Sequence, residues 1–74
     1  MIDPSTVGER LKALRMKRNM TQKQIAAVLG ITPQAVSSWE CGNTYPDPAY
    51  FDDLVKVLDC SLDEIFLGSN GTAG

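Results

Sequence analysis

The segment from residue 22 to residue 41 constrains the fold more than any other part of the chain; it reads QKQIAAVLGITPQAVSSWEC. Apolar or small side chains recur in it at the spacing of amphipathic helices, and polar residues fill the gaps. The recurring positions are Ile25, Ala26, Leu29, Ile31, Val36 and Trp39. Gly30 lies at the joint, where a left-handed conformation costs little without a Cβ. This pattern predicts two short helices, at 22–29 and 33–41, that bury one face each.

Start and stop signals predict three more helices, at 7–18, 48–58 and 62–67. A Ser or Thr followed three positions later by Glu or Gln is typical of a capping box. Such pairs are Thr6 with Glu9, Thr21 with Gln24, and Ser61 with Glu64. An N-cap residue before a proline in the first turn is found at Thr32 and Pro33 and again at Asp47 and Pro48. Stop signals are expected at Asn19, Gly30, Gly42, Asp59 with Cys60, and Gly68.

The predicted fold class is therefore all-α, a compact domain of five helices over residues 1–68 with a flexible polar tail at 69–74. Each helix is too short to persist alone in water, so packing must hold them together. We expect Trp39 to fill the core rather than to stack on bases. The other inward stripes are Val7, Leu11 and Leu14, then Phe51, Leu54, Val55 and Leu58, then Leu62, Ile65 and Phe66.

Charge is distributed unevenly along the chain. The net charge is −2, but residues 1–38 carry six basic groups against two acidic ones, whereas residues 39–74 carry Lys56 against seven acidic groups. One interpretation is that these charges belong to solvated helix faces; the other is that the basic half faces phosphates and the acidic half faces away.

Composition excludes several classes of function. Without histidine, and with Cys41 and Cys60 as two separated thiols expected to be reduced, the sequence predicts no metal site and no catalytic residues. No cofactor is expected. Because no apolar run could span a bilayer and the first residues have no signal-peptide core, we expect a soluble cytoplasmic protein with no membrane partner.

The outward face of the helix at 33–41 suits base recognition in the DNA major groove. Its side chains are Thr32, Pro33, Gln34, Ser37 and Ser38. A glutamine offers a donor and an acceptor to adenine, serine pairs with several bases, and the proline and the threonine methyl could contact a thymine methyl. The alternative is an ordinary solvated face, although such a face usually carries long charged side chains.

The motifs GERLKALRMKRNMTQKQIAAVLGITPQAVSSWECG and YPDPAYFDDLVKVLDCSLDEIF, covering about residues 7–67, resemble the lambda-repressor-like helix-turn-helix family. These are the phage-repressor and xenobiotic-response-element-type regulators. The resemblance implies a helix-turn-helix formed by the second and third helices. It also implies that the third helix, 33–41, enters the major groove.

The resemblance also implies roles for individual residues. Gln34 and Ser38 match the main base-reading positions, flanked by Thr32, Pro33 and Ser37. Gln22 matches a residue that grips a DNA phosphate, Lys23 is expected beside it, and the backbone amides of Asn43 and Thr44 match a loop that meets the next phosphate. Arg15 and Glu40 match a largely buried structural ion pair.

Two departures from the family pattern affect the expected affinity. Relatives often carry Lys or Arg where this chain has Ser38, Asn43 and Tyr45, and Pro33 replaces a polar base reader of some members. Fewer cations release fewer counterions, so we expect modest affinity that relies on a homodimer. Ile65, Phe66 and Leu67 are expected either in the core or at a dimer surface, together with the turn before them or the tail.

The leading hypothesis is a sequence-specific transcriptional regulator, most often a repressor, that binds a palindromic double-stranded operator as a homodimer. It would be a prokaryotic or phage protein, cytoplasmic and nucleoid-associated when bound. One alternative is a protein-interaction module such as an antitoxin, whose acidic half binds a partner. Another is the DNA-binding fragment of a longer regulator.

Overall fold

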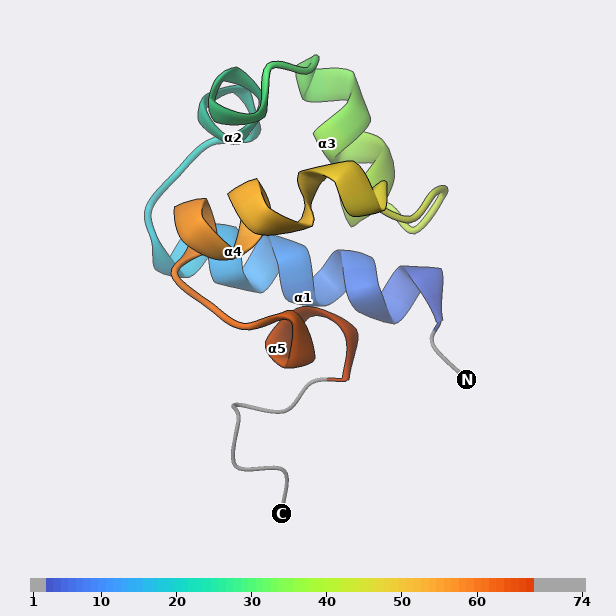
Figure 1. The fold of residues 1–74 in the computed structure, drawn as a ribbon. Helices are drawn as coiled ribbons and strands as arrows, with labels where there is room; N and C mark the ends of the chain where they lie inside the picture. The colour runs from blue at the N-terminus through green and yellow to red at the C-terminus, as the bar shows by residue number, and fades with distance from the viewer. Residues whose placement is uncertain (1–2, 68–74) are drawn as a thin grey trace.

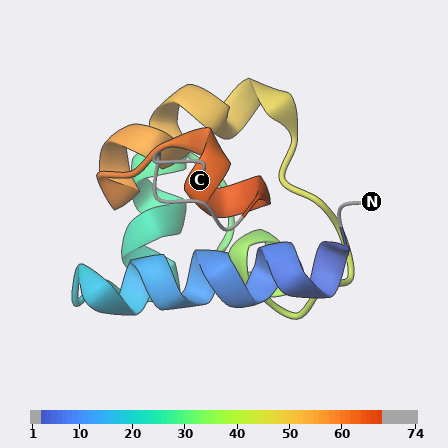
Figure 2. The same ribbon diagram turned by 90° about the horizontal axis from the view of Figure 1, so that it is seen from below.

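A computed structural model describes residues 3–67, which form helices and no strand. The elements are α1 (Pro4–Lys17), α2 (Gln22–Leu29), α3 (Pro33–Glu40), the 3-10 turn η1 (Pro48–Tyr50), α4 (Phe51–Leu58) and α5 (Leu62–Phe66). In Figure 1, α2 and α3 lie on one side of α1 and α5 lies on the other. The view from below shows α5 between α1 and α4 (Figure 2). The predicted all-α fold with five α-helices is confirmed. The polar tail at 69–74 and the stop signal at Gly68 lie outside the described residues.

One apolar core joins all five α-helices. Its ten buried side chains are Val7, Leu11, Ile25, Ala26, Leu29, Val36, Trp39, Leu54, Leu58 and Ile65. Trp39 is only 6% exposed and its ring lies 5.8 Å from that of Tyr50, so its predicted place in the core is confirmed. Leu14, Val55 and Phe66 pack at the edge of this core, partly buried.

Local signals in the sequence locate most helix starts correctly. Two of the three predicted capping boxes are formed: Thr21 with Gln24 at α2, and Ser61 with Glu64 at α5. Thr32 caps α3 as predicted, because its hydroxyl accepts a hydrogen bond from the Ala35 N–H.

The predicted start of α1 is wrong. The helix begins at Pro4 instead of Val7, and Asp3 is its N-cap, with a carboxylate oxygen 2.9 Å from the Ser5 amide nitrogen. An acidic cap followed by proline is itself a strong start signal, and it precedes Thr6 in the chain. The expected capping box of Thr6 with Glu9 is therefore replaced by an earlier cap.

Smaller differences concern the other helix ends. The expected helix over 48–58 begins as the 3-10 turn η1, capped by Asp47, and becomes α-helical at Phe51. The third and fifth helices each end one residue earlier than predicted, at Glu40 and Phe66. Such one-residue differences are usual where helix ends fray.

Gly8 allows α1 to touch the end of α3 backbone to backbone. A Cβ built at Gly8 would lie 2.6 Å from the carbonyl oxygen of Glu40 and would also overlap that of Trp39. No side chain fits there, so glycine is needed in the middle of a helix where it is otherwise unfavourable. Helical periodicity in the sequence gives no signal for this contact at Gly8.

Candidate nucleic-acid interface

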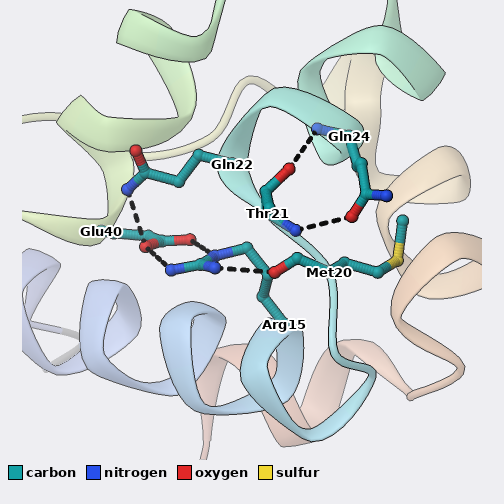
Figure 3. Close-up of polar contacts among 6 residues, drawn as sticks. All are labelled: Arg15, Met20, Thr21, Gln22, Gln24 and Glu40. Carbon is teal, nitrogen blue, oxygen red and sulfur yellow. Dashed lines mark hydrogen bonds and ion pairs between the residues drawn. The ribbon is translucent and has the colours of Figure 1, made fainter.

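The structure brings Arg15 of α1 and Glu40 of α3 together in a two-bond ion pair (Figure 3). The guanidinium Nε lies 2.7 Å from one carboxylate oxygen, and Nη2 lies 3.0 Å from the other. The side chains are 13% and 4% exposed, and Arg15 Nη1 also donates to the carbonyl of Met20 at 2.8 Å. The hydrogen bond to Glu40 raises the pKa of Arg15 above its usual value, so the guanidinium stays protonated.

Gln22 joins this pair from the first turn of α2. Its side-chain nitrogen donates to Glu40 Oε1 at 3.0 Å, so that one carboxylate links α1, α2 and α3 (Figure 3). We call Arg15, Glu40 and Gln22 the polar triad. Sequence reasoning placed Gln22 at a phosphate and missed its bond to Glu40, because residues 18 positions apart give no local signal of contact.

The outward face of α3 contains the side chains expected to read bases. Pro33 and Gln34 are exposed, whereas Ser37 and Ser38 are half-buried. This orientation follows from the burial of Val36 at 3% exposure on the opposite side of the helix. Gln34 is the longest polar side chain on the outward face.

Two of the residues on this face also have intramolecular hydrogen bonds. The Thr32 hydroxyl is used as the helix cap, which leaves its methyl group for contacts with a ligand. The hydroxyl oxygens of Ser38 and Thr44 lie 3.1 Å apart and share a hydrogen bond. Any base contact of Ser38 must therefore be compatible with this bond to the loop after α3.

The loop after α3 differs from expectation at Asn43. Gly42 has a φ of +82°, and the Asn43 N–H donates back to the carbonyl of Ser38 at 3.0 Å. This bond closes the end of the helix, as is common where a left-handed glycine follows the last turn. The Asn43 amide expected at a phosphate is thus already used, and the exposed Asn43 side chain and the Thr44 amide remain for that role.

The basic groups of the N-terminal half differ in whether they have a partner inside the protein. Arg10 Nη1 donates to the Phe66 carbonyl at 3.0 Å and so caps the end of α5. Arg18 lies 4.0 Å from Asp59 in an exposed pair. Lys23 is exposed next to Gln22 on α2. Arg10 is therefore bonded within the protein, whereas Arg18 and Lys23 remain exposed.

Cys41 and Cys60 are free thiols. Burial, together with the nearby carboxylates of Glu64 and Asp59, raises the pKa of Cys60 to about 11. Among residues 3–67, no group of three or more potential metal ligands is found. No helix in this part of the chain is long and apolar enough to cross a membrane.

The fold and the exposed face of α3 together define an all-α helix-turn-helix domain, in which α2 and α3 form the motif. A family model described as "Helix-turn-helix" matches residues 11–65, so the chain belongs to the lambda-repressor-like helix-turn-helix family. In a crystal structure of the P22 c2 repressor protein in complex with synthetic operator 9T, the similar chain has a TM-score of 0.79. It is 33% identical in sequence, and the match covers 85% of this chain and 96% of that one.

Curated relatives are mostly transcriptional regulators. The HTH-type transcriptional regulator DicA of Escherichia coli is 38% identical over 85% of this chain and 47% of its own length. The HTH-type transcriptional activator BcrR of Enterococcus faecalis is 35% identical over 82% of this chain and 30% of its own length. This chain thus spans about half or less of the length of these relatives. A type II methyltransferase from Moraxella sp is also similar, over 12% of its length, so the domain occurs in enzymes as well.

Proposed function

We propose that this chain binds double-stranded DNA sequence-specifically and acts in transcriptional regulation, most simply as a repressor. The observation that carries the proposal is the outward face of α3, where exposed Gln34 lies opposite buried Val36 and Trp39. A helix of this size fits the major groove, and its small polar side chains can reach base edges. The relative of known structure, the P22 c2 repressor, has this fold and is in complex with an operator.

Base reading is assigned to Gln34 and Ser38, with Thr32, Pro33 and Ser37 around them. Gln34 can bond adenine through both atoms of its amide, and the half-buried Ser38 supplies a shorter contact near the loop. These five residues surround the exposed side of α3 without a charged group among them. Specificity then depends on hydrogen bonds and methyl contacts.

Phosphate binding is assigned to Gln22 and Lys23 at the start of α2 and to Asn43 and Thr44 in the loop after α3. The N-terminus of a helix attracts phosphate through free N–H groups and the helix dipole. Because residues 33–47 contain no Lys or Arg, and Arg10 and Arg15 are hydrogen-bonded within the protein, we expect modest affinity and a shallow salt dependence.

A homodimer that binds a palindromic operator completes the proposal. Ile65 has no exposed surface and belongs to the core, so the apolar side chains available to a second subunit here are Leu62 of α5 and Leu67 just after it, which are 41% and 62% exposed. Recognition helices in such dimers lie about 34–36 Å apart. The protein would act in the cytoplasm of a prokaryote and associate with the nucleoid when bound.

Selection from a random duplex library at low salt, followed by gel shifts of the enriched sites, tests this function. Enrichment of a palindrome is the expected result. Gln34→Ala should weaken binding by about 1–3 kcal/mol and relax preference at one base position of each half-site. Gln22→Ala should weaken all sequences alike.

A second candidate function is a protein-interaction module, such as an antitoxin, whose acidic half binds a partner. Exposed carboxylates on α4 and α5 favour it, namely Asp52, Asp53 and Asp63. A folded protein that enriches no duplex in the selection would support this candidate over the first. The chain could also act as the DNA-binding part of a longer regulator, since it matches only 47% of the length of DicA and 30% of that of BcrR.

A further inference from the structure

We propose that Glu40 is a positioning residue for DNA binding, which orients the amide of Gln22 toward a backbone phosphate. This role is distinct from its ion pair with Arg15, and it rests on the proposed DNA-binding function. The observation behind it is the hydrogen bond of 3.0 Å from the Gln22 side-chain nitrogen to Glu40 Oε1 (Figure 3).

The chemistry of the two side chains fixes which end of the amide faces Glu40. An ionised carboxylate only accepts hydrogen bonds, whereas a glutamine amide has a donating nitrogen at one end and an accepting oxygen at the other. Glu40 therefore holds the nitrogen of Gln22 and repels its oxygen. That nitrogen has a second N–H, which can donate to a phosphate oxygen while the first stays on Glu40.

The carboxylate that does this is itself held firmly. Both of its oxygens accept from Arg15, and Arg15 in turn donates to the Met20 carbonyl at 2.8 Å. Only 4% of the Glu40 side chain is exposed, so water does not compete freely for its oxygens. Gln22 is thus attached to a fixed acceptor, which lowers the entropy that it would lose on gripping a phosphate.

Charge balance makes the arrangement compatible with an anion nearby. A lone carboxylate next to a DNA phosphate would repel it, but the guanidinium of Arg15 neutralises Glu40 through two short bonds. The Gln22 site lies in the first turn of α2, an eight-residue helix whose dipole favours negative charge at this end. Arg15 therefore serves DNA binding indirectly, without touching the nucleic acid.

The substitution Glu40→Gln distinguishes the orientation of the Gln22 amide from the effect of net charge on DNA binding. The new amide has a single acceptor oxygen; when that oxygen accepts from Arg15 Nε, as Glu40 Oε2 does at 2.7 Å, the NH2 group turns toward the NH2 group of Gln22. The Gln22 amide must then move or flip. The substitution also removes one negative charge, which by itself would strengthen DNA binding, so weaker binding would be opposite in sign to the charge effect.

A double-mutant cycle tests the proposal with the full chain and a short mixed-sequence duplex at low salt. We expect Gln22→Met to weaken binding about tenfold, Glu40→Gln to weaken it about fivefold, and the double variant to bind no more weakly than Gln22→Met alone. Asp53→Asn, an exposed acid on α4 with the same change of charge, is the matched control and should not weaken binding.

The possible results are distinct. Losses that simply add in the double variant would show that Glu40 does not act through Gln22, and would overturn the positioning role while leaving DNA binding intact. No binding of any duplex by the unmodified protein would remove the proposed function and this role together. If Glu40→Gln does not fold, the side-chain amide signals of Gln22 in the unmodified protein decide by NMR: a shift on adding duplex supports the role, and unchanged signals overturn it.

Discussion

The two halves of this domain are held together by different physics. The half that contains α1, α2 and α3 depends on directional contacts, namely the polar triad and the backbone contact at Gly8. The half that contains α4 and α5 depends mainly on apolar burial, with Ile65 fully inside and the Phe51 and Phe66 rings 5.1 Å apart. Directional contacts fix orientation more tightly than apolar burial does, and they are found where α3 must be presented at a fixed angle.

Among the changes considered, removal of the Arg15 side chain should have the largest effect on the free energy of unfolding. Arg15→Ala leaves the Glu40 carboxylate buried without its partner, and we expect a loss of about 3–5 kcal/mol in the free energy of unfolding. Urea unfolding followed by circular dichroism measures it. Arg18→Ala is the control, because its pair with Asp59 is exposed and 4.0 Å long, and it should change stability by about 0.5 kcal/mol or less. An Arg15→Ala protein as stable as the parent would show that the triad does not hold this half together.

Gly8→Ala should have the next largest effect. The added methyl group meets the carbonyl oxygens of Trp39 and Glu40, so α1 must move away from α3, at a cost of about 2–3 kcal/mol. In most helices the same change stabilises, by about 1 kcal/mol. Gly30→Ala is a useful comparison: its φ is +74° but a Cβ there meets nothing within 4 Å, so only backbone strain of about 1 kcal/mol is expected. Thermal unfolding that ranks Gly30→Ala as the more harmful change would contradict the close contact.

Ile65→Val tests the contribution of apolar burial in the half that contains α4 and α5. Loss of one buried methylene should cost about 1 kcal/mol and leave the fold and DNA binding otherwise unchanged, because neighbouring apolar side chains can relax around it. Chemical denaturation and a gel shift on the same sample measure both properties. A loss of specific binding much greater than the loss of stability would indicate that α5 also sets the angle of α3.

The smallest expected effect concerns Cys60. Its pKa is raised to about 11 in the folded protein, so folding favours the neutral thiol. The stabilisation is complete below the pKa of the unfolded thiol and is lost as pH rises through about 11. The melting temperature of the parent should fall more between pH 9 and 11 than that of Cys60→Ser, and identical falls would exclude the contribution.

Local signals explain how much of the fold could be predicted from the sequence. The limits of α2 were predicted correctly because a capping box and Gly30 mark its two ends. At α1 two start signals compete, and the geometry of Asp3 with Pro4 decided the outcome. The need for glycine at position 8 depends on where α3 lies in space, which no spacing in the sequence specifies.

The candidate DNA-binding surface could likewise be predicted only as far as local sequence signals reach. The exposed face of α3 follows from helical periodicity, whereas the choice of Gln34 and Ser38 on that face rests on the resemblance to the family. The partners of Gln22 and Arg10 are 18 and 56 residues away, and these contacts appear only once the helices are packed. Gln22, expected at a phosphate, and Arg10, counted among the basic groups, thus each have a hydrogen-bond partner inside the protein as well.

The first turns of α1 have a practical consequence for where this domain begins. Val7 is 1% exposed in the core, and Gly8 contacts the backbone at the end of α3. Arg10 donates a hydrogen bond to the carbonyl of Phe66, the last residue of α5. All three precede residue 11, where the match to the family begins. A fragment that begins at residue 11 would keep the whole helix-turn-helix but lose the first turns of α1, which contact α3 and α5. Because Asp3 caps α1, we expect a fragment that presents α3 correctly to begin no later than Asp3.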